Sequence, residues 1–105
     1  ASPYLKRIAA TAEEYERRRQ SPSTARAYAS DWRSFEGWCC HRGLDAKAGD
    51  PRVVGLYLSA CASGDGLPKA SVASIERRLA AISSVYRAAD IRFSREHPEI
   101  SHVLA

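Results

Sequence analysis

The sequence predicts a single all-α domain, and three observations favour this fold class. Its 105 residues are enough for one ordinary hydrophobic core and too few for two. Apolar residues recur at spacings of three and four, and no long stretch alternates apolar and polar residues as a strand does. The composition, 45% hydrophobic and 27% charged, is that of a globular protein and argues against disorder.

Two helices are expected in the first part of the chain. The first spans about residues 2–20, and its apolar stripe consists of Tyr4, Leu5, Ile8, Ala12 and Tyr15. The second spans about residues 24–42, with Ser23 as its N-cap and Gly43 after its end. Its stripe predicts a face buried in the core and consists of Tyr28, Trp32, Phe35, Trp38 and Cys39.

Three more helical segments are expected in the rest of the chain. Asp50 caps a third helix that begins with Pro51, and the turn at residues 63–66 ends it. The fourth helix spans about residues 70–89. Its stripe has the most regular helical period in the chain: Val72, Ile75, Leu79, Ile82, Val85 and Ala89. A last turn or two begins at His97-Pro98 and reaches Ala105.

The charge balance suits a nucleic-acid partner, but a solvated surface that happens to be basic explains it as well, so it does not decide between the two. Sixteen basic residues stand against twelve acidic ones, a net charge of +4, and thirteen of the sixteen are arginine. The arginine fork donates bidentately to phosphates and base edges. Two helix starts combine hydroxyl and basic groups, which suits a backbone phosphate: Ser23, Thr24, Arg26 and Ser30 in one, and Lys69, Ser71, Ser74, Arg77 and Arg78 in the other. The alternative is that the hydroxyls only cap and the arginines are solvated.

No residue pattern predicts catalysis, a metal or a cofactor. Cys39-Cys40-His41 lacks the usual zinc spacing, and His97 and His102 lie five residues apart rather than four. A glycine-rich phosphate loop is absent. Three cysteines, two of them adjacent, do not describe a disulfide framework, and neither a signal peptide nor a membrane span is present. A soluble intracellular domain is therefore expected.

Two stretches carry a family resemblance. The first reads SPSTARAYASDWRSFEGWC and has Thr four residues before Tyr, then an acidic residue, then spaced aromatics: Thr24, Tyr28, Asp31, Trp32, Phe35 and Trp38. The second reads SIERRLAAISSVYRAADI, with Ser74 where the pattern usually has Thr and Tyr86 where it usually has His. Together with the tail HPEISHVLA, they resemble the N-terminal core-binding domain of tyrosine recombinases, the phage integrases and their relatives, over residues 1–105.

The resemblance implies a SAM-like orthogonal bundle of four to five helices that forms one core-binding domain over residues 1–105. The family's catalytic residues belong to a C-terminal domain that is not in this chain, so the chain itself is expected not to be an enzyme. Two helices of such a domain cross the major groove. Implied phosphate contacts are Thr24, Ser71 and Ser74, with Ser23 and Ser30 nearby; Arg26 and Arg77 are implied at base edges, and Lys69 and Arg78 at phosphates or the groove. Arg33 either joins them or pairs with Glu36 or Asp31.

The implied partners are double-stranded DNA and other recombinase protomers, with no membrane and no small-molecule substrate, in a cytoplasmic, nucleoid-associated setting. This hypothesis requires Arg26, Lys69, Arg77 and Arg78 to converge on one surface. A helical protein–protein adaptor is the alternative, and it requires an exposed apolar patch. A thiol or metal enzyme requires Cys39 or Cys40 to be exposed beside a histidine.

Overall fold

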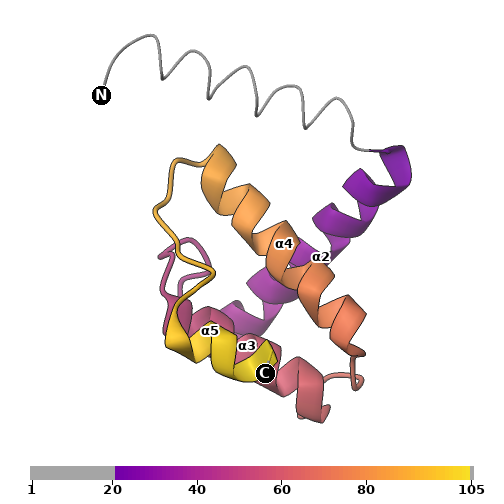
Figure 1. Ribbon diagram of the computed structural model, residues 1–105, viewed down its shortest axis with the longest axis vertical. Coiled ribbons are helices and arrows are strands. Elements are labelled where there is room, and N and C mark those ends of the chain that lie inside the picture. The colour runs from indigo at the N-terminus through magenta and orange to yellow at the C-terminus, as the bar shows by residue number, and fades with distance from the viewer. Residues whose placement is uncertain (1–20, 105) are drawn as a thin grey trace, which may run out of the picture.

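The structure, a computed structural model, describes residues 21–104. They form four helices, α2 (Pro22–His41), α3 (Pro51–Ser63), α4 (Val72–Ala88) and α5 (Pro98–Leu104), and no strand, so the predicted all-α class is confirmed for them (Figure 1). The helix expected over residues 2–20 lies outside the described residues. Within residues 21–104, no helix is long and apolar enough to cross a membrane.

Helix α2 begins earlier than predicted, and the N-cap prediction was wrong. Ser21, not Ser23, is the N-cap: its Oγ accepts a hydrogen bond from the backbone N–H of Thr24 at 3.1 Å. Pro22 then occupies the first helical position, which suits proline because that position needs no N–H donor. At the other end, Gly43 has a φ of 68° and the N–H of Leu44 bonds back to the carbonyl of Cys39, so Gly43 ends the helix as predicted.

The other helices follow their local signals closely. Asp50 caps α3, accepting from the N–H of Arg52 at 2.9 Å, and Gly64 ends α3 in the left-handed region. Ser71 caps α4, so this helix begins at Val72 rather than at about residue 70. The short α5 starts at Pro98, where the sequence places it.

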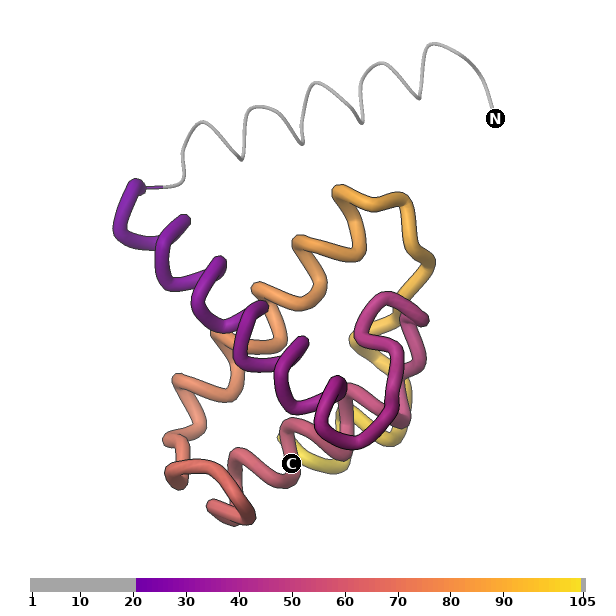
Figure 2. Tube along the Cα trace, turned by 180° about the vertical axis from the view of Figure 1, so that it is seen from behind, coloured from indigo at the N-terminus to yellow at the C-terminus, as the bar shows by residue number. Residues whose placement is uncertain are grey.

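The four helices pack as two pairs, α2 with α4 and α3 with α5. Helices α2 and α4 cross each other near their middles, and both views show the crossing (Figures 1 and 2). Helices α3 and α5 lie side by side, and α3 also packs on α4. Gly55 of α3 allows this approach, because a Cβ there would lie 2.8 Å from the backbone oxygen of Glu99 in α5. The absence of one side chain therefore sets how closely α5 sits on α3.

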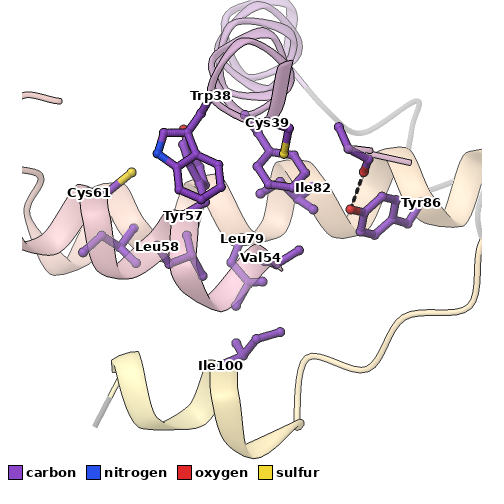
Figure 3. Packing of buried hydrophobic residues seen from close by; sticks show 13 residues of the cluster. Trp38, Cys39, Val54, Tyr57, Leu58, Cys61, Leu79, Ile82, Tyr86 and Ile100 are labelled. Atoms are coloured by element: carbon purple, nitrogen blue, oxygen red, sulfur yellow. Dashed lines mark hydrogen bonds between the residues drawn. The ribbon is translucent and has the colours of Figure 1, made fainter. Parts of the chain in front are cut away.

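Aromatic rings from α2, α3 and α4 lie in the buried core (Figure 3), and the partly buried Phe93, in the loop before α5, packs against it. The ring of Tyr57 lies 5.1 Å from that of Phe35 and 5.5 Å from that of Trp38, and both pairs are tilted or edge-on. The buried hydroxyl of Tyr86 donates to the carbonyl of Ala46 at 2.5 Å. Three of the five residues in the predicted α2 stripe are buried, Phe35, Trp38 and Cys39, which confirms that this face of α2 packs into the core. The predicted α4 stripe supplies Ile75, Leu79 and Ile82.

Candidate nucleic-acid interface

The start of α2 carries a cluster of hydroxyls at the surface. The Oγ of Ser21 lies 2.8 Å from Thr24 Oγ1 and 3.2 Å from Ser23 Oγ. No acidic residue stands in this first turn, and the positive end of the helix dipole adds to the favourable potential for an anion. Sequence reasoning missed Ser21 because Ser21 and Ser23 flank Pro22 and either suits an N-cap.

A polar stripe continues from this turn along α2. Ser23, Arg26, Ser30 and Arg33 follow one another at spacings of three, four and three, so they share one face, and all four are exposed. Arg33 forms no ion pair within residues 21–104, so neither of its predicted partners, Glu36 or Asp31, holds it. The stripe presents two cations to solvent on the side of α2 away from its aromatic face.

The start of α4 has a similar arrangement of hydroxyl groups. Ser71 accepts from the N–H of Ser74 at 3.2 Å, and its hydroxyl donates to Ser74 Oγ at 3.1 Å. The first turn again has no acidic residue, and exposed Lys69 precedes it. The first turns of α2 and α4 lie on the same side of the point where the two helices cross (Figures 1 and 2). Both predicted helix starts therefore lie on one side of the crossing, the start of α2 above it and the start of α4 below it in Figure 1.

Arg77 joins α4 to α2 at the crossing. Its Nε donates to Asp31 Oδ2 at 2.9 Å and its Nη2 donates to Asp31 Oδ1 at 3.1 Å, a bidentate pair. The Asp31 side chain is 6% exposed and that of Arg77 is 49% exposed. Sequence reasoning proposed Arg77 for base edges, but two nitrogens of its guanidinium are already occupied by a carboxylate. Asp31, suggested only as a partner for Arg33, instead pairs across the fold.

Arg78 also faces inward in part. Its Nη1 donates to Tyr57 Oη at 3.0 Å and lies 3.3 Å from Cys61 Sγ. The Tyr57 hydroxyl in turn donates to Ser34 Oγ at 2.9 Å, so α4, α3 and α2 are linked by one chain of hydrogen bonds. Sequence reasoning missed Tyr57 and Ser34. The available signal was that a phenol on a core stripe needs a partner for its hydroxyl.

The four basic residues that the DNA-binding hypothesis places on one surface therefore fall into two groups, according to whether they have a partner within the described residues. Arg26 and Lys69 are exposed at the two helix starts. Arg77 and Arg78 lie on α4, and each has a protein partner. Burial, with a smaller contribution from Asp45, raises the pKa of the Cys39 thiol to about 11, so Cys39 is a protonated core residue at neutral pH. In the described part of the chain, no group of three or more His, Cys, Asp or Glu side chains could hold a metal ion.

A hollow of about 580 Å³ lies at the opposite end of α4. Its wall is the last turn of α4 and the segment after it, and it includes the side chains of Arg87, Asp90, Arg92 and Arg95. Two hydroxyls that line it already donate hydrogen bonds within the fold: Ser83 donates to the carbonyl of Leu79 and Tyr86 to that of Ala46.

The large apolar side chains exposed among the described residues, Leu44, Leu56 and Val72, come from three different segments.

Comparisons with known proteins give one positive finding. The protein-family model described as phage integrase, N-terminal SAM-like domain, matches residues 12–92. This range contains both stretches that carry the sequence resemblance and the starts of α2, α3 and α4. Searches of curated proteins and of solved structures found no match.

Proposed function

Because the chain belongs to the family of phage integrase N-terminal SAM-like domains, we propose that it binds double-stranded DNA for a tyrosine-type site-specific recombinase. In this role the chain holds DNA and breaks no bond, since the reacting residues belong to a separate catalytic domain of the recombinase. One observation carries the proposal beyond the family: α2 and α4 both start with hydroxyl-rich turns that lack acidic residues, on the same side of their crossing.

Each helix start has the groups that a DNA backbone needs. Thr24 and Ser23 on α2, and Ser71 and Ser74 on α4, offer hydroxyls beside free backbone N–H groups for phosphate oxygens. Lys69 adds a cation at the start of α4.

Base edges are assigned to the α2 stripe. Arg26 and Arg33 are exposed and free of ion pairs within the described residues, so their forks are available, with Ser30 between them. Arg77 is assigned a different role from the one its sequence position suggested: through Asp31 it sets how α2 and α4 cross, and so how far apart the two contact sites stand.

The same surface would work together with other protein partners. A catalytic domain on the other side of the duplex, and further recombinase protomers bound to the same DNA, would add contacts that a small basic module lacks alone. We therefore expect the chain by itself to bind DNA modestly and with a strong dependence on salt, because phosphate contacts release counterions.

Fluorescence anisotropy with a labelled duplex tests the proposal. The variant Arg26→Ala/Lys69→Ala removes one cation from each helix start, and Arg52→Ala/Arg95→Ala removes two exposed cations from other segments as the matched control. We expect the first to weaken binding at least tenfold and to reduce the slope of log K against log salt by about 0.9 for each phosphate that is no longer neutralised. The control should change affinity by less than about threefold.

Two outcomes would contradict the proposal. Equal reductions in affinity in both double variants would mean that the duplex responds only to net charge, not to the helix starts. A folded chain that binds no duplex even at low salt would favour the adaptor alternative instead, for which exposed Leu56 and Val72 are the side chains to test.

A further inference from the structure

The guanidinium of Arg78 lies half inside the protein. Its Nη1 is used twice, toward Tyr57 Oη and Cys61 Sγ, and its Nε is buried without a hydrogen-bond partner. Its Nη2 has no partner within the described residues and is not among the buried unpaired atoms, so it reaches the surface. Arg78 is thus held from the inside and presents its outer nitrogen to solvent.

No carboxylate within residues 21–104 neutralises this charge. The ion pairs of the described residues join Arg52 to Asp50 and Arg77 to Asp31, and neither includes Arg78. The neighbours of this partly buried cation are a phenol and a thiol, which carry no charge at neutral pH. The cation therefore keeps most of its attraction for an external anion. Its neighbour Arg77 differs in this respect, because Asp31 already occupies two of its nitrogens.

The inner support of Arg78 is rigid. Tyr57 is fully buried, and its ring is packed against those of Phe35 and Trp38, which fixes where its hydroxyl lies (Figure 3). Since that hydroxyl donates to Ser34, its lone pairs face the Arg78 donor. Cys61 stands one turn further along α3 on the same face and supplies a second acceptor. An arginine held in this way loses little rotamer freedom when it binds an anion.

We infer that Tyr57 is a positioning residue that orients the Arg78 guanidinium toward one oxygen of a DNA phosphate. This inference rests on the proposed DNA-binding function and adds to it a contact from α4, Arg78, together with the buried residue behind it. The two adjacent arginines of α4 then have separate tasks: Arg77 holds α2 against α4, and Arg78 holds the ligand. Tyr57 itself touches no DNA and acts only through Arg78.

A double-mutant cycle on DNA affinity tests this inference. Arg78→Ala removes the charge, so it should weaken binding and reduce the salt slope by about 0.9. Tyr57→Phe keeps the charge but removes its anchor, so it should weaken binding about five- to tenfold and leave the salt slope unchanged. In the Arg78→Ala background, Tyr57→Phe should have no further effect. Tyr86→Phe is the matched control, because it also removes one buried phenol hydroxyl, from a partner that is not an arginine.

A measurement without DNA gives an independent readout. The buried Nε–H of Arg78 should give a sharp, slowly exchanging signal in ¹H–¹⁵N spectra of the wild-type chain. Tyr57→Phe should broaden or abolish this signal, and Tyr86→Phe should leave it in place. If Tyr57→Phe does not fold, Ser34→Ala replaces it, because this change removes the acceptor that orients the Tyr57 hydroxyl.

The outcomes separate the two proposals. Additive effects of Tyr57→Phe and Arg78→Ala on affinity, or an Arg78 signal that persists in Tyr57→Phe, would overturn the role of Tyr57 while DNA binding stands. A folded wild-type chain that binds no duplex would overturn the DNA-binding function and the phosphate assignment of Arg78 together. Equal reductions in DNA affinity in Tyr57→Phe and Tyr86→Phe would mean that both changes act by disturbing the core, and the positioning role of Tyr57 would be wrong.

Discussion

At the scale of single residues, the pair between Asp31 and Arg77 joins α2 to α4 by charge as well as by hydrogen bonds. The Asp31 side chain is almost fully buried, and the two bonds from Arg77 satisfy both of its oxygens. A buried carboxylate without such donors is strongly unfavourable, because its charge loses the hydration it has in the unfolded chain. The pair therefore ties α2 to α4 through a carboxylate that is buried and satisfied.

Removal of Arg77 is expected to destabilise the fold. Arg77→Ala leaves the Asp31 carboxylate buried and unpaired, and we expect the free energy of unfolding to fall by about 1–3 kcal/mol. Urea denaturation followed by circular dichroism measures the change. Arg26→Ala, which removes an exposed arginine of α2, should stay within about 0.5 kcal/mol of the wild-type chain. Equal stabilities of the two variants would show that the pair adds nothing to the fold.

At the scale of elements, the contact of α5 with α3 depends on a glycine. Helix α5 has seven residues, too few to be stable alone, so its packing on α3 holds it in place. Ile100 is its fully buried anchor, and Gly55 opposite lets the two backbones approach. Glycine is unfavourable inside a helix, so its presence at position 55 indicates a requirement for space.

Two glycine substitutions should have opposite effects. Gly55→Ala places a Cβ against the backbone oxygen of Glu99, and we expect a destabilisation of about 1–3 kcal/mol with displacement of α5. Gly37→Ala in α2 meets no atom within 4 Å, so it should stabilise the protein by about 0.5–1 kcal/mol through helix propensity. Thermal and urea unfolding of both variants measure these changes. Stabilisation by Gly55→Ala would contradict the close approach of α5.

At the scale of the whole molecule, the core contains ionisable groups that it keeps neutral. Burial is the main cause that raises the pKa values of Cys39, Tyr57 and Tyr86. These groups come from α2, α3 and α4, so their protonation is linked to the assembly of all three helices. Any transition that exposes the core also lets them ionise in alkaline solution.

The stability of the fold should therefore decrease at alkaline pH. The unfolded chain releases the Cys39 proton near pH 9, whereas the folded chain holds it to about pH 11, so each rise in pH across this range favours unfolding. The two tyrosines act in the same direction from about pH 10. Urea midpoints at intervals between pH 7 and pH 10.5 should stay level up to about pH 9 and then fall. Cys39→Ala should delay the decrease, and a constant midpoint up to pH 10.5 would contradict the argument.

Local signals in the sequence predicted the helices of residues 21–104 and the family to which the chain belongs. Capping residues, the helical period of apolar side chains and proline and glycine at helix ends act over a few residues, so they are readable without a fold. This is why the starts of α3 and α5 and the end of α2 agree with prediction, and why the resemblance to the phage integrases agrees with the family model. The error at the first cap, Ser23 in place of Ser21, arose because two serines flank the same proline.

The partners of the arginines, by contrast, become visible only in the folded protein. Arg77 pairs with a carboxylate 46 residues away, and Arg78 with a phenol 21 residues away, so their partners depend on how the helices cross. In sequence, Arg26, Arg77 and Arg78 look alike, and all three were assigned to DNA. The difference between them is electrostatic and geometric: a buried carboxylate occupies two nitrogens of Arg77, buried neutral acceptors hold Arg78 by one nitrogen, and exposed Arg26 has no partner within the described residues.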